Sequence, residues 1–129
     1  MIEYLDLDDL LVAADAAVGG HALVRDVGLL QTSATRPQSS AFGEDAYPDL
    51  DQKAAALLHA IVAGHPLVDG NKRLGWAATR LFYLLNGADL AAPADEAFVL
   101  VIAIAAGEMG DVMAIASRLR AWRVSTPGS

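Results

Sequence analysis

Apolar residues recur along this chain with the spacing of amphipathic helices. Leucine, valine, isoleucine and alanine fall at i, i+3 and i+4 in several stretches, and no run alternates with period two for long enough to indicate a sheet. A chain of 129 residues has room for one domain. We therefore predict an all-α fold, a single-domain bundle of six helices.

Helix ends can be placed from capping residues in the first half of the chain. Asp6 or Asp8 caps a first helix, which the two glycines at 19–20 end. A second helix begins at about Asp26 and must stop before Pro37. The stretch 36–48, rich in Pro, Ser and Gly, is predicted to be an extended loop or a small hairpin.

Asp49 starts a third predicted helix, with Gln52 as its partner in a capping box, and Gly64 ends it. A fourth helix is expected over residues 71–85, and a shared apolar spacing directs five of its side chains inward: Leu74, Ala78, Leu81, Phe82 and Leu85.

The last predicted helices follow Pro93 and Asp111. The helix after Pro93 has a core, residues 97–106, that is apolar on every side, so we expect this helix to be central. We expect the domain to span residues 1–124 and residues 125–129 to form a frayed, disordered tail.

Composition and charge exclude several classes of protein. With 54% apolar and 19% charged residues, the chain is too apolar for a disordered segment. Its longest uncharged stretch, 54–68, is too short to cross a bilayer, so no membrane association is expected. The start lacks the pattern of a secretory signal and there is no cysteine, which predicts a cytoplasmic location. A formal charge of −7 argues against general nucleic-acid binding.

Nine residues, 65–73, combine an imidazole, a carboxylate, an amide and two cations between two apolar helices. Gly70 permits a tight turn into the second of these helices. That helix then begins with free main-chain N–H groups at Asn71, Lys72 and Arg73, which form an anion-binding site. The cluster therefore predicts a site for a phosphate-bearing ligand.

A polyphosphate nucleotide suits this cradle, because Lys72 adds a mobile point charge and Arg73 a planar fork. Such a ligand arrives with a divalent cation, and Mg²⁺ typically binds one or two carboxylates together with substrate phosphates. Asp69 is the candidate ligand for Mg²⁺. His65 is the candidate general base, since imidazole can accept a proton from a hydroxyl near neutral pH.

Other local motifs fit less well. Five residues separate Gly64 from Gly70 and Asn71 follows the second glycine, whereas a Walker A loop has four residues there and then a lysine. His59 and His65 are six positions apart and point in different directions on a helix, so they form no zinc pair of the i, i+4 kind. We expect His59 to be a core or boundary histidine.

Residues 65–73 resemble the signature of the Fic/Doc family, His-x-Phe-x-(Asp/Glu)-Gly-Asn-x-Arg, and in particular its Doc branch, where Lys stands before the Arg. The likeness extends upstream, in the order seen in Doc-type toxins, over Arg25-Asp26-Val27-Gly28-Leu29-Leu30, Arg36-Pro37-Gln38, Phe42-Gly43-Glu44, Tyr47-Pro48 and Lys53-Ala54-Ala55-Ala56. The resemblance implies a six-helix bundle and the toxin of a toxin–antitoxin pair. It also implies a protein kinase that transfers the ATP γ-phosphate to elongation factor Tu, inhibiting translation.

The resemblance also assigns roles to residues of this chain. His65 matches the family's general base, Asp69 its metal-binding acid, and the anion-binding residues match Gly70, Asn71, Lys72 and Arg73. The segment 37–46 matches a flap that holds the target peptide beside the nucleotide, with Gln38, Phe42 and Gly43 as its candidate contacts. ATP and Mg²⁺ are the implied cofactors, and a Phd-like antitoxin is the implied partner.

Departures from the family pattern leave two alternatives open. Fic AMP transferases have Gly where Lys72 stands and a further Arg where Trp76 stands, so both positions favour the Doc branch over AMP transfer. Leu67 replaces the usual Phe at a position expected to face the core. The first alternative is a Fic-type AMP transferase, and the second is a catalytically silent binding module of the same fold.

Control is expected to come from outside the chain. Many Fic proteins carry an inhibitory helix of the form (Ser/Thr)-x-x-x-Glu-(Gly/Asn). Here Ser40 and Glu44 have the required spacing, but Asp45 stands where Gly or Asn is needed, and the segment is expected to be a loop. We count this motif as absent. A Phd-like antitoxin whose tail folds into an amphipathic helix would need an uncovered apolar groove on this chain.

We expect the remaining polar and aromatic candidates to be structural. Arg80 is expected to form a surface salt bridge, the cations Arg118, Arg120 and Arg123 a solvated helix end, and Trp76 and Trp122 packing contacts.

Overall fold

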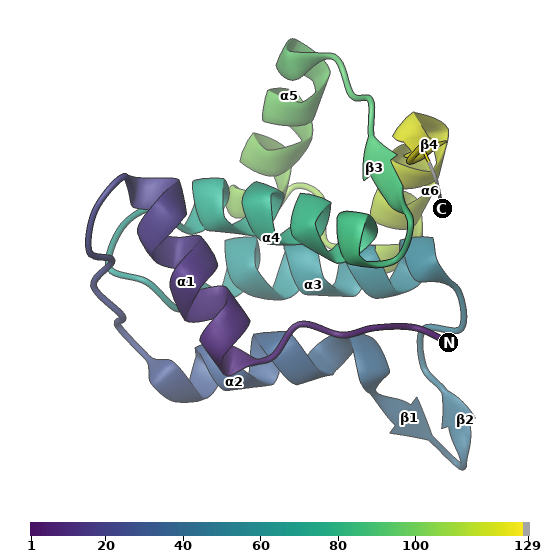
Figure 1. Ribbon diagram of the computed structural model, residues 1–129, viewed down its shortest axis with the longest axis horizontal. Coiled ribbons are helices and arrows are strands. Elements are labelled where there is room, and N and C mark those ends of the chain that lie inside the picture. The colour runs from purple at the N-terminus through teal and green to yellow at the C-terminus, as the bar shows by residue number, and fades with distance from the viewer. Residues whose placement is uncertain (128–129) are drawn as a thin grey trace.

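Six α-helices hold most of the residues that the structure describes, 1–127 of a computed structural model (Figure 1). They are α1 (Leu7–Val18), α2 (Val27–Thr35), α3 (Leu50–Gly64), α4 (Asn71–Leu85), α5 (Ala94–Ala105) and α6 (Val112–Trp122). A 3₁₀ turn, Arg36–Gln38, follows α2. Two short antiparallel sheets of two strands each are present: β1 (Ser40–Ala41) and β2 (Glu44–Asp45) form a hairpin, and β3 (Ala88–Leu90) pairs with β4 (Arg123–Ser125), which follows α6. The predicted six-helix all-α bundle is confirmed. Within residues 1–127, no helix has the length and hydropathy needed to cross a membrane.

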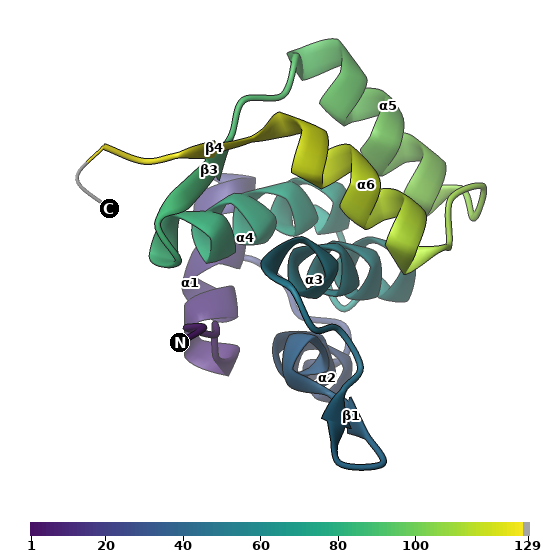
Figure 2. The same ribbon diagram turned by 90° about the vertical axis from the view of Figure 1, so that its right-hand side faces the viewer.

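The central helix is α3, with α4, α2 and α6 packed around it (Figure 2). Burial extends around its whole circumference and includes two charged side chains, Asp51 and Lys53, each only 2% exposed. The prediction that the helix after Pro93 is central is therefore wrong. That helix, α5, packs against α3 and α4 on one side and leaves Phe98 and Val99 exposed on the other. A helix that is apolar all round can keep one face uncovered, and sequence alone does not say which face.

Side-chain caps fix the helix starts much as the aspartates predict. Asp6, not Asp8, caps α1 and forms a reciprocal capping box with Asp9. The capping box predicted for α3 is only half formed. Asp49 accepts from the Gln52 main-chain N–H at 2.8 Å, but the Gln52 side chain does not reciprocate, and its Oε1 is buried without a partner among the described residues. Simple caps at Asp26 and Asp111 start α2 and α6.

Close contact between α3 and α4 depends on one glycine. A Cβ at Gly75 would collide with the Cγ2 of Val62 on α3, so any larger residue would push the two helices apart. Of the inward positions predicted for α4, Leu74, Ala78 and Phe82 are fully buried. The other two, Leu81 and Leu85, are exposed by 39% and 47%. These two predictions are wrong because no element of the described chain covers that side of α4.

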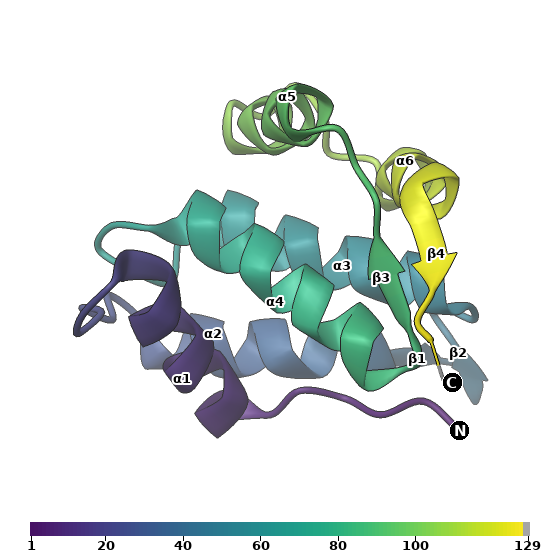
Figure 3. The ribbon, with the colours of Figure 1, turned by 45° about the horizontal axis from the view of Figure 1, so that its top comes forward.

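The C-terminal strand corrects the predicted domain end. β4 lies beside β3, and Ser125 pairs with Ala88 (Figure 3). The Thr126 N–H continues the pairing by donating to the Gly87 carbonyl. Ser125 therefore belongs to the folded domain rather than to a frayed tail, and residues 128–129 of the predicted tail lie outside the described residues.

The loop or hairpin expected over residues 36–48 is the β1–β2 hairpin. It precedes α3, whereas the loop that carries His65 follows α3, so the two lie at opposite ends of this helix (Figures 1 and 3). A helix of 15 residues is roughly 22 Å long. This separation bears on the predicted flap.

Candidate active site

The predicted site residues lie together in one loop and in the helical turn that follows it. Residues 65–70 join the C-terminus of α3 to the N-terminus of α4. His65 is the C-cap of α3, with φ 54° and ψ 58°, and its side chain is exposed. The helix ends at Gly64, as predicted, and the residue with the left-handed conformation is the next one, His65. That conformation costs a non-glycine residue about 1–2 kcal/mol, so neighbouring contacts must hold it.

A segment ahead of α2 holds this loop from the side. Val24 and Leu67 form an antiparallel bridge, and the Val68 N–H donates to the Leu23 carbonyl at 2.9 Å. The main-chain N–H groups of Arg25 and Asp26 both donate to the Pro66 carbonyl, at 2.8 and 3.0 Å. Leu67 is buried, as predicted. The loop is therefore fixed by main-chain pairing as well as by the helices that it joins.

Asn71 closes the loop through its side chain. Its Oδ1 accepts from the Leu67 N–H at 2.8 Å, and its Nδ2 donates to the Leu67 carbonyl at 3.0 Å. Both ends of the amide are used, so the contribution that we predicted for Asn71 in anion binding falls on its main-chain N–H. The amide clamp holds the first turn of α4 against the loop.

Glycine is required at position 70 for two reasons. Gly70 has a φ of 90°, which L side chains rarely adopt, and a Cβ there would lie 2.6 Å from the Cγ1 of Val18. As the N-cap of α4, Gly70 has no side chain to offer, and α4 has no side-chain cap within residues 1–127. The helix therefore begins with N–H groups free to bind an anion. Lys72 and Arg73, both exposed, add positive charge at this end.

Asp69 lies next to this helix start and is exposed. Its Oδ1 accepts from the Gly70 N–H at 2.8 Å, and its second oxygen has no hydrogen bond to any described residue. The described chain has no group of three acidic or histidine side chains that could hold a metal ion. A cation bound by Asp69 would therefore need phosphate and water oxygens for most of its other ligands, which suits Mg²⁺ on a nucleotide.

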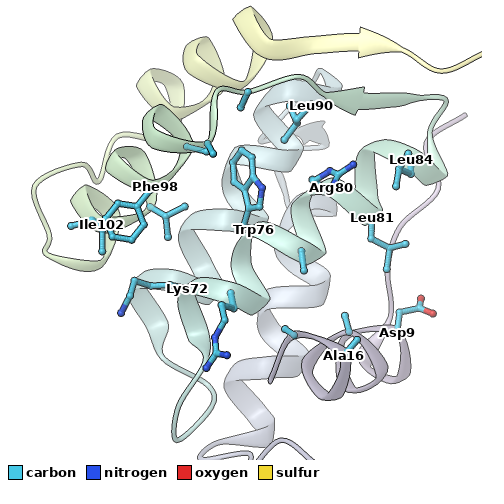
Figure 4. Close-up of a pocket in the computed structure, with 18 of the residues that line it drawn as sticks. Asp9, Ala16, Lys72, Trp76, Arg80, Leu81, Leu84, Leu90, Phe98 and Ile102 are labelled. Atoms are coloured by element: carbon cyan, nitrogen blue, oxygen red, sulfur yellow. The ribbon is translucent and has the colours of Figure 1, made fainter. Parts of the chain in front are cut away.

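Two hollows adjoin the start of α4. The smaller, about 300 Å³, is lined by residues that include His21, Asp69 and Arg73. The larger is an apolar groove of about 1090 Å³ along α4, between α1 and α5. In Figure 4, Trp76 stands in the middle of this groove, with Phe98 on one side. Within residues 1–127, Arg73 lines both hollows and His65 lines neither.

Comparison of the sequence with known proteins identifies its family. A family model described as Fic/DOC matches residues 4–83, which include the whole loop and the start of α4. The chain belongs to the Fic/DOC family. A curated relative, Toxin Doc of Mycolicibacterium smegmatis (strain ATCC 700084 / mc(2)155), is 53% identical over 95 residues, which is 74% of this chain and 73% of that protein. The predicted Fic/Doc resemblance is therefore confirmed.

The structure does not bring the predicted flap residues of this Fic/DOC chain to the site. Gln38 belongs to the 3₁₀ turn, and Phe42 and Gly43 form the exposed tip of the β1–β2 hairpin. This hairpin is at the N-terminal end of α3, and His65 is at its C-terminal end. The placement argues against a contact of these three residues with a target held beside the nucleotide.

Two buried or partly buried cations instead anchor the hairpin to α3. The Lys53 Nζ donates at 2.6 Å to the carbonyl of Tyr47, which follows β2. Arg36 lies 2.8 Å, through Nη1, from the Nδ1 of His59 and donates through Nε to the Tyr47 hydroxyl. Burial and the Arg36 charge lower the pKa of His59. His59 is thus a boundary histidine, as expected, and Lys53 has a structural role that the sequence did not indicate.

The remaining predictions for arginine side chains have different outcomes. Arg80 forms the predicted salt bridge, donating to both carboxylate oxygens of Asp89. Arg118, Arg120 and Arg123 are all exposed, as expected, but Arg120 and Arg123 also donate to the buried carboxylate of Asp51.

The aromatic prediction holds. Trp76 and Trp122 pack edge to face, with ring centroids 6.3 Å apart.

The candidate site has one further contributor that sequence reasoning missed, the side chain of Arg25. It donates to the main chain at Gly64 and His65. The one sequence signal for this role of Arg25 was its place in the segment that resembles Doc-type toxins.

Proposed function

We propose that this chain is the toxin of a toxin–antitoxin pair and acts as a kinase, transferring the γ-phosphate of ATP to a Ser or Thr hydroxyl of a translation factor. Family membership and the printed name of the relative, Toxin Doc, support the first part. The kinase activity is supported by one short loop. It joins the exposed His65 to the N-terminus of α4, which has no side-chain cap within residues 1–127. By resemblance, the target is elongation factor Tu.

The chain's own residues suit a Mg²⁺·ATP substrate. The main-chain N–H groups at the start of α4 bind phosphate oxygens, and Lys72 and Arg73 offset their charge. Asp69 would supply a carboxylate ligand for Mg²⁺, which would neutralise charge that develops on the phosphates. Arg73 also lines the hollow that Asp69 borders, so cation and phosphate sites adjoin.

His65 then acts as the general base. Its imidazole accepts the proton of the target hydroxyl while the hydroxyl oxygen bonds to the γ-phosphorus. The bond from this phosphorus to the β–γ bridging oxygen breaks, and ADP leaves with that oxygen. The products are a phosphorylated target, ADP and a protonated His65, which returns its proton to water. The exposed side chain of His65 has no hydrogen-bond partner among residues 1–127, so it is free to meet a target from outside.

A Phd-like antitoxin is the proposed partner, and the apolar groove along α4 is its proposed binding surface. The groove exposes apolar side chains of three helices, α1, α4 and α5, among them Val12, Leu84 and Phe98. A disordered antitoxin tail could fold there as an amphipathic helix. The groove ends at Lys72 and Arg73, so a bound helix would also approach the phosphate site.

The test is transfer from ATP labelled at either the α- or the γ-phosphate, with purified elongation factor Tu and with a cell lysate. The proposal predicts γ-label on protein with wild type and none with His65→Ala. Label from the α position would instead indicate AMP transfer. Absence of label from both positions would indicate a binding module without turnover.

A further inference from the structure

We infer that Arg25 is a positioning residue for the proposed reaction: its guanidinium holds the main chain of His65 in the left-handed conformation from which the imidazole meets the target hydroxyl. The inference rests on the proposed function. It concerns the geometry of His65 itself and can be examined with or without transfer activity.

The guanidinium spans two consecutive carbonyl groups at the end of α3. The Arg25 Nε donates to the His65 carbonyl at 2.7 Å, and Nη2 donates to the Gly64 carbonyl at 3.1 Å. The last carbonyl groups of a helix lack partners within the helix and carry its negative end. A planar cation with two parallel donors satisfies both carbonyls and fixes their relative direction.

His65 needs such support because its conformation is unfavourable by itself. Only Phe42 and His65 among the described non-glycine residues have positive φ, and both have φ 54°. Phe42 sits at a hairpin tip, where turns commonly use this region. His65 instead ends a 15-residue helix at a position where glycine is usual. Without a restraint, the His65 main chain would relax toward negative φ and redirect the imidazole.

No described group holds the imidazole of His65 by a hydrogen bond. The side chain of His65 is exposed and has no hydrogen bond to residues 1–127, so its position follows from its main chain and rotamer. The main-chain N–H groups of Arg25 and Asp26 hold the next residue, Pro66, from the same side. The side chain of Arg25 thus extends this set of hydrogen bonds by one residue, to the proposed base His65.

The phosphate site has its own support. The Asn71 amide clamps Leu67, and Gly70 starts α4, without any hydrogen bond from the Arg25 side chain. Loss of the guanidinium should therefore affect the base and leave nucleotide binding nearly unchanged. This separation distinguishes positioning from a general loss of structure.

The experiment compares Arg25→Ala and Arg25→Lys with wild type and with Arg118→Ala, a matched removal of an exposed arginine on α6. The kinetic arm predicts a roughly 10- to 100-fold lower kcat for Arg25→Ala at nearly unchanged KM for ATP. Arg25→Lys should fall between, since an ammonium group cannot span both carbonyls as a planar fork. Guanidinium ion, added well below unfolding concentrations, should partly restore Arg25→Ala, because the position is exposed.

The second arm uses NMR and needs no turnover. The NOE between the amide proton and Hα of the same residue is strongest at positive φ, because the two protons are then closest. It should be strong for His65 in wild type and Arg118→Ala but weaker in Arg25→Ala. An unchanged His65 NOE in Arg25→Ala would overturn the inference, as would a kcat equal to that of wild type. Absence of transfer by wild type would count against the proposed function instead, and the NMR arm would still decide the role of Arg25.

Discussion

The Tyr83 hydroxyl donates to the Oδ1 of Asp51 at 2.7 Å, joining α4 to the start of α3 in the core. The second carboxylate oxygen of Asp51 accepts from Arg120 at 3.2 Å and from Arg123 at 2.9 Å. Burial, and then the bond to Asp51, raise the pKa of Tyr83, which keeps its proton available for donation. One buried carboxylate therefore ties the C-terminal α6 and β4 to the helices that carry the candidate site.

Replacement of Asp51 by alanine should destabilise the protein by about 3 kcal/mol, because it leaves a buried hydroxyl and two arginines without their shared acceptor. Denaturant unfolding monitored by tryptophan fluorescence would measure this. Arg80→Ala, which removes an exposed ion pair, should change the free energy of unfolding by no more than about 1 kcal/mol. Equal effects of the two substitutions would contradict the structural role of Asp51.

His59 predicts how stability depends on pH. Its folded-state pKa lies below the ordinary value of 6.5, because of burial and the nearby Arg36 charge. At a pH between the folded-state pKa and 6.5, the unfolded chain binds a proton at His59 that the folded chain does not bind. The free energy of unfolding therefore falls as the pH drops through 6.5 toward the folded-state pKa. Unfolding in urea at a series of pH values should show this loss. His59→Gln, which can still accept from Arg36 but does not titrate, should flatten it; an unchanged slope would exclude His59 as the cause.

Much of the fold could be predicted because its signals are local. Aspartates at helix starts have their capping partners within three residues, and the bounds of α4 follow from Gly70 and Asn86. The candidate site was equally accessible, since its base, acid and anion cradle are contiguous from His65 to Arg73. Contiguity lets a motif report on chemistry without knowledge of the fold.

What could not be predicted depends on partners far apart in the sequence. Asp51 is buried because Arg120 and Arg123 reach it from 69 and 72 positions away. The exposure of α5 depends on which apolar helix other elements cover, and the length of α3 separates Phe42 from the loop at His65. Periodicity and composition contain none of this information.

Phe98 tests the groove. It is 65% exposed, so Phe98→Glu should leave the stability of the unpartnered chain nearly unchanged. If an antitoxin helix binds along α4, this substitution should weaken that complex by about 2 kcal/mol, or roughly 30-fold in Kd. Titration calorimetry with the antitoxin would measure it. Met113→Glu, at an exposed apolar position on α6 outside the groove lining, is the control and should bind normally. Equal binding by both variants would exclude the groove.

Lys72 tests the choice between kinase and AMP transferase. Lys72→Gly restores the residue found in Fic AMP transferases and removes one exposed charge from the start of α4. Transfer of the γ-phosphate should fall roughly tenfold or more, as expected when one stabilising donor is lost, and transfer from the α position should become measurable. Lys72→Ala separates loss of charge from the low helix propensity of glycine. An unchanged γ-transfer rate in both variants would remove Lys72 from the mechanism.

In the proposed mechanism, His65 acts as the base for phosphate transfer to a protein hydroxyl. The most direct measurement is mass spectrometry of the translation factors from cells that express either wild type or His65→Ala at equal levels. Loss of a general base lowers the rate roughly 10²- to 10⁴-fold, and an exposed loop substitution should leave the fold intact. We expect a phosphoryl group on a Ser or Thr of one translation factor with wild type and none with His65→Ala. Equal phosphorylation by both proteins, or an AMP group in place of phosphate, would contradict it.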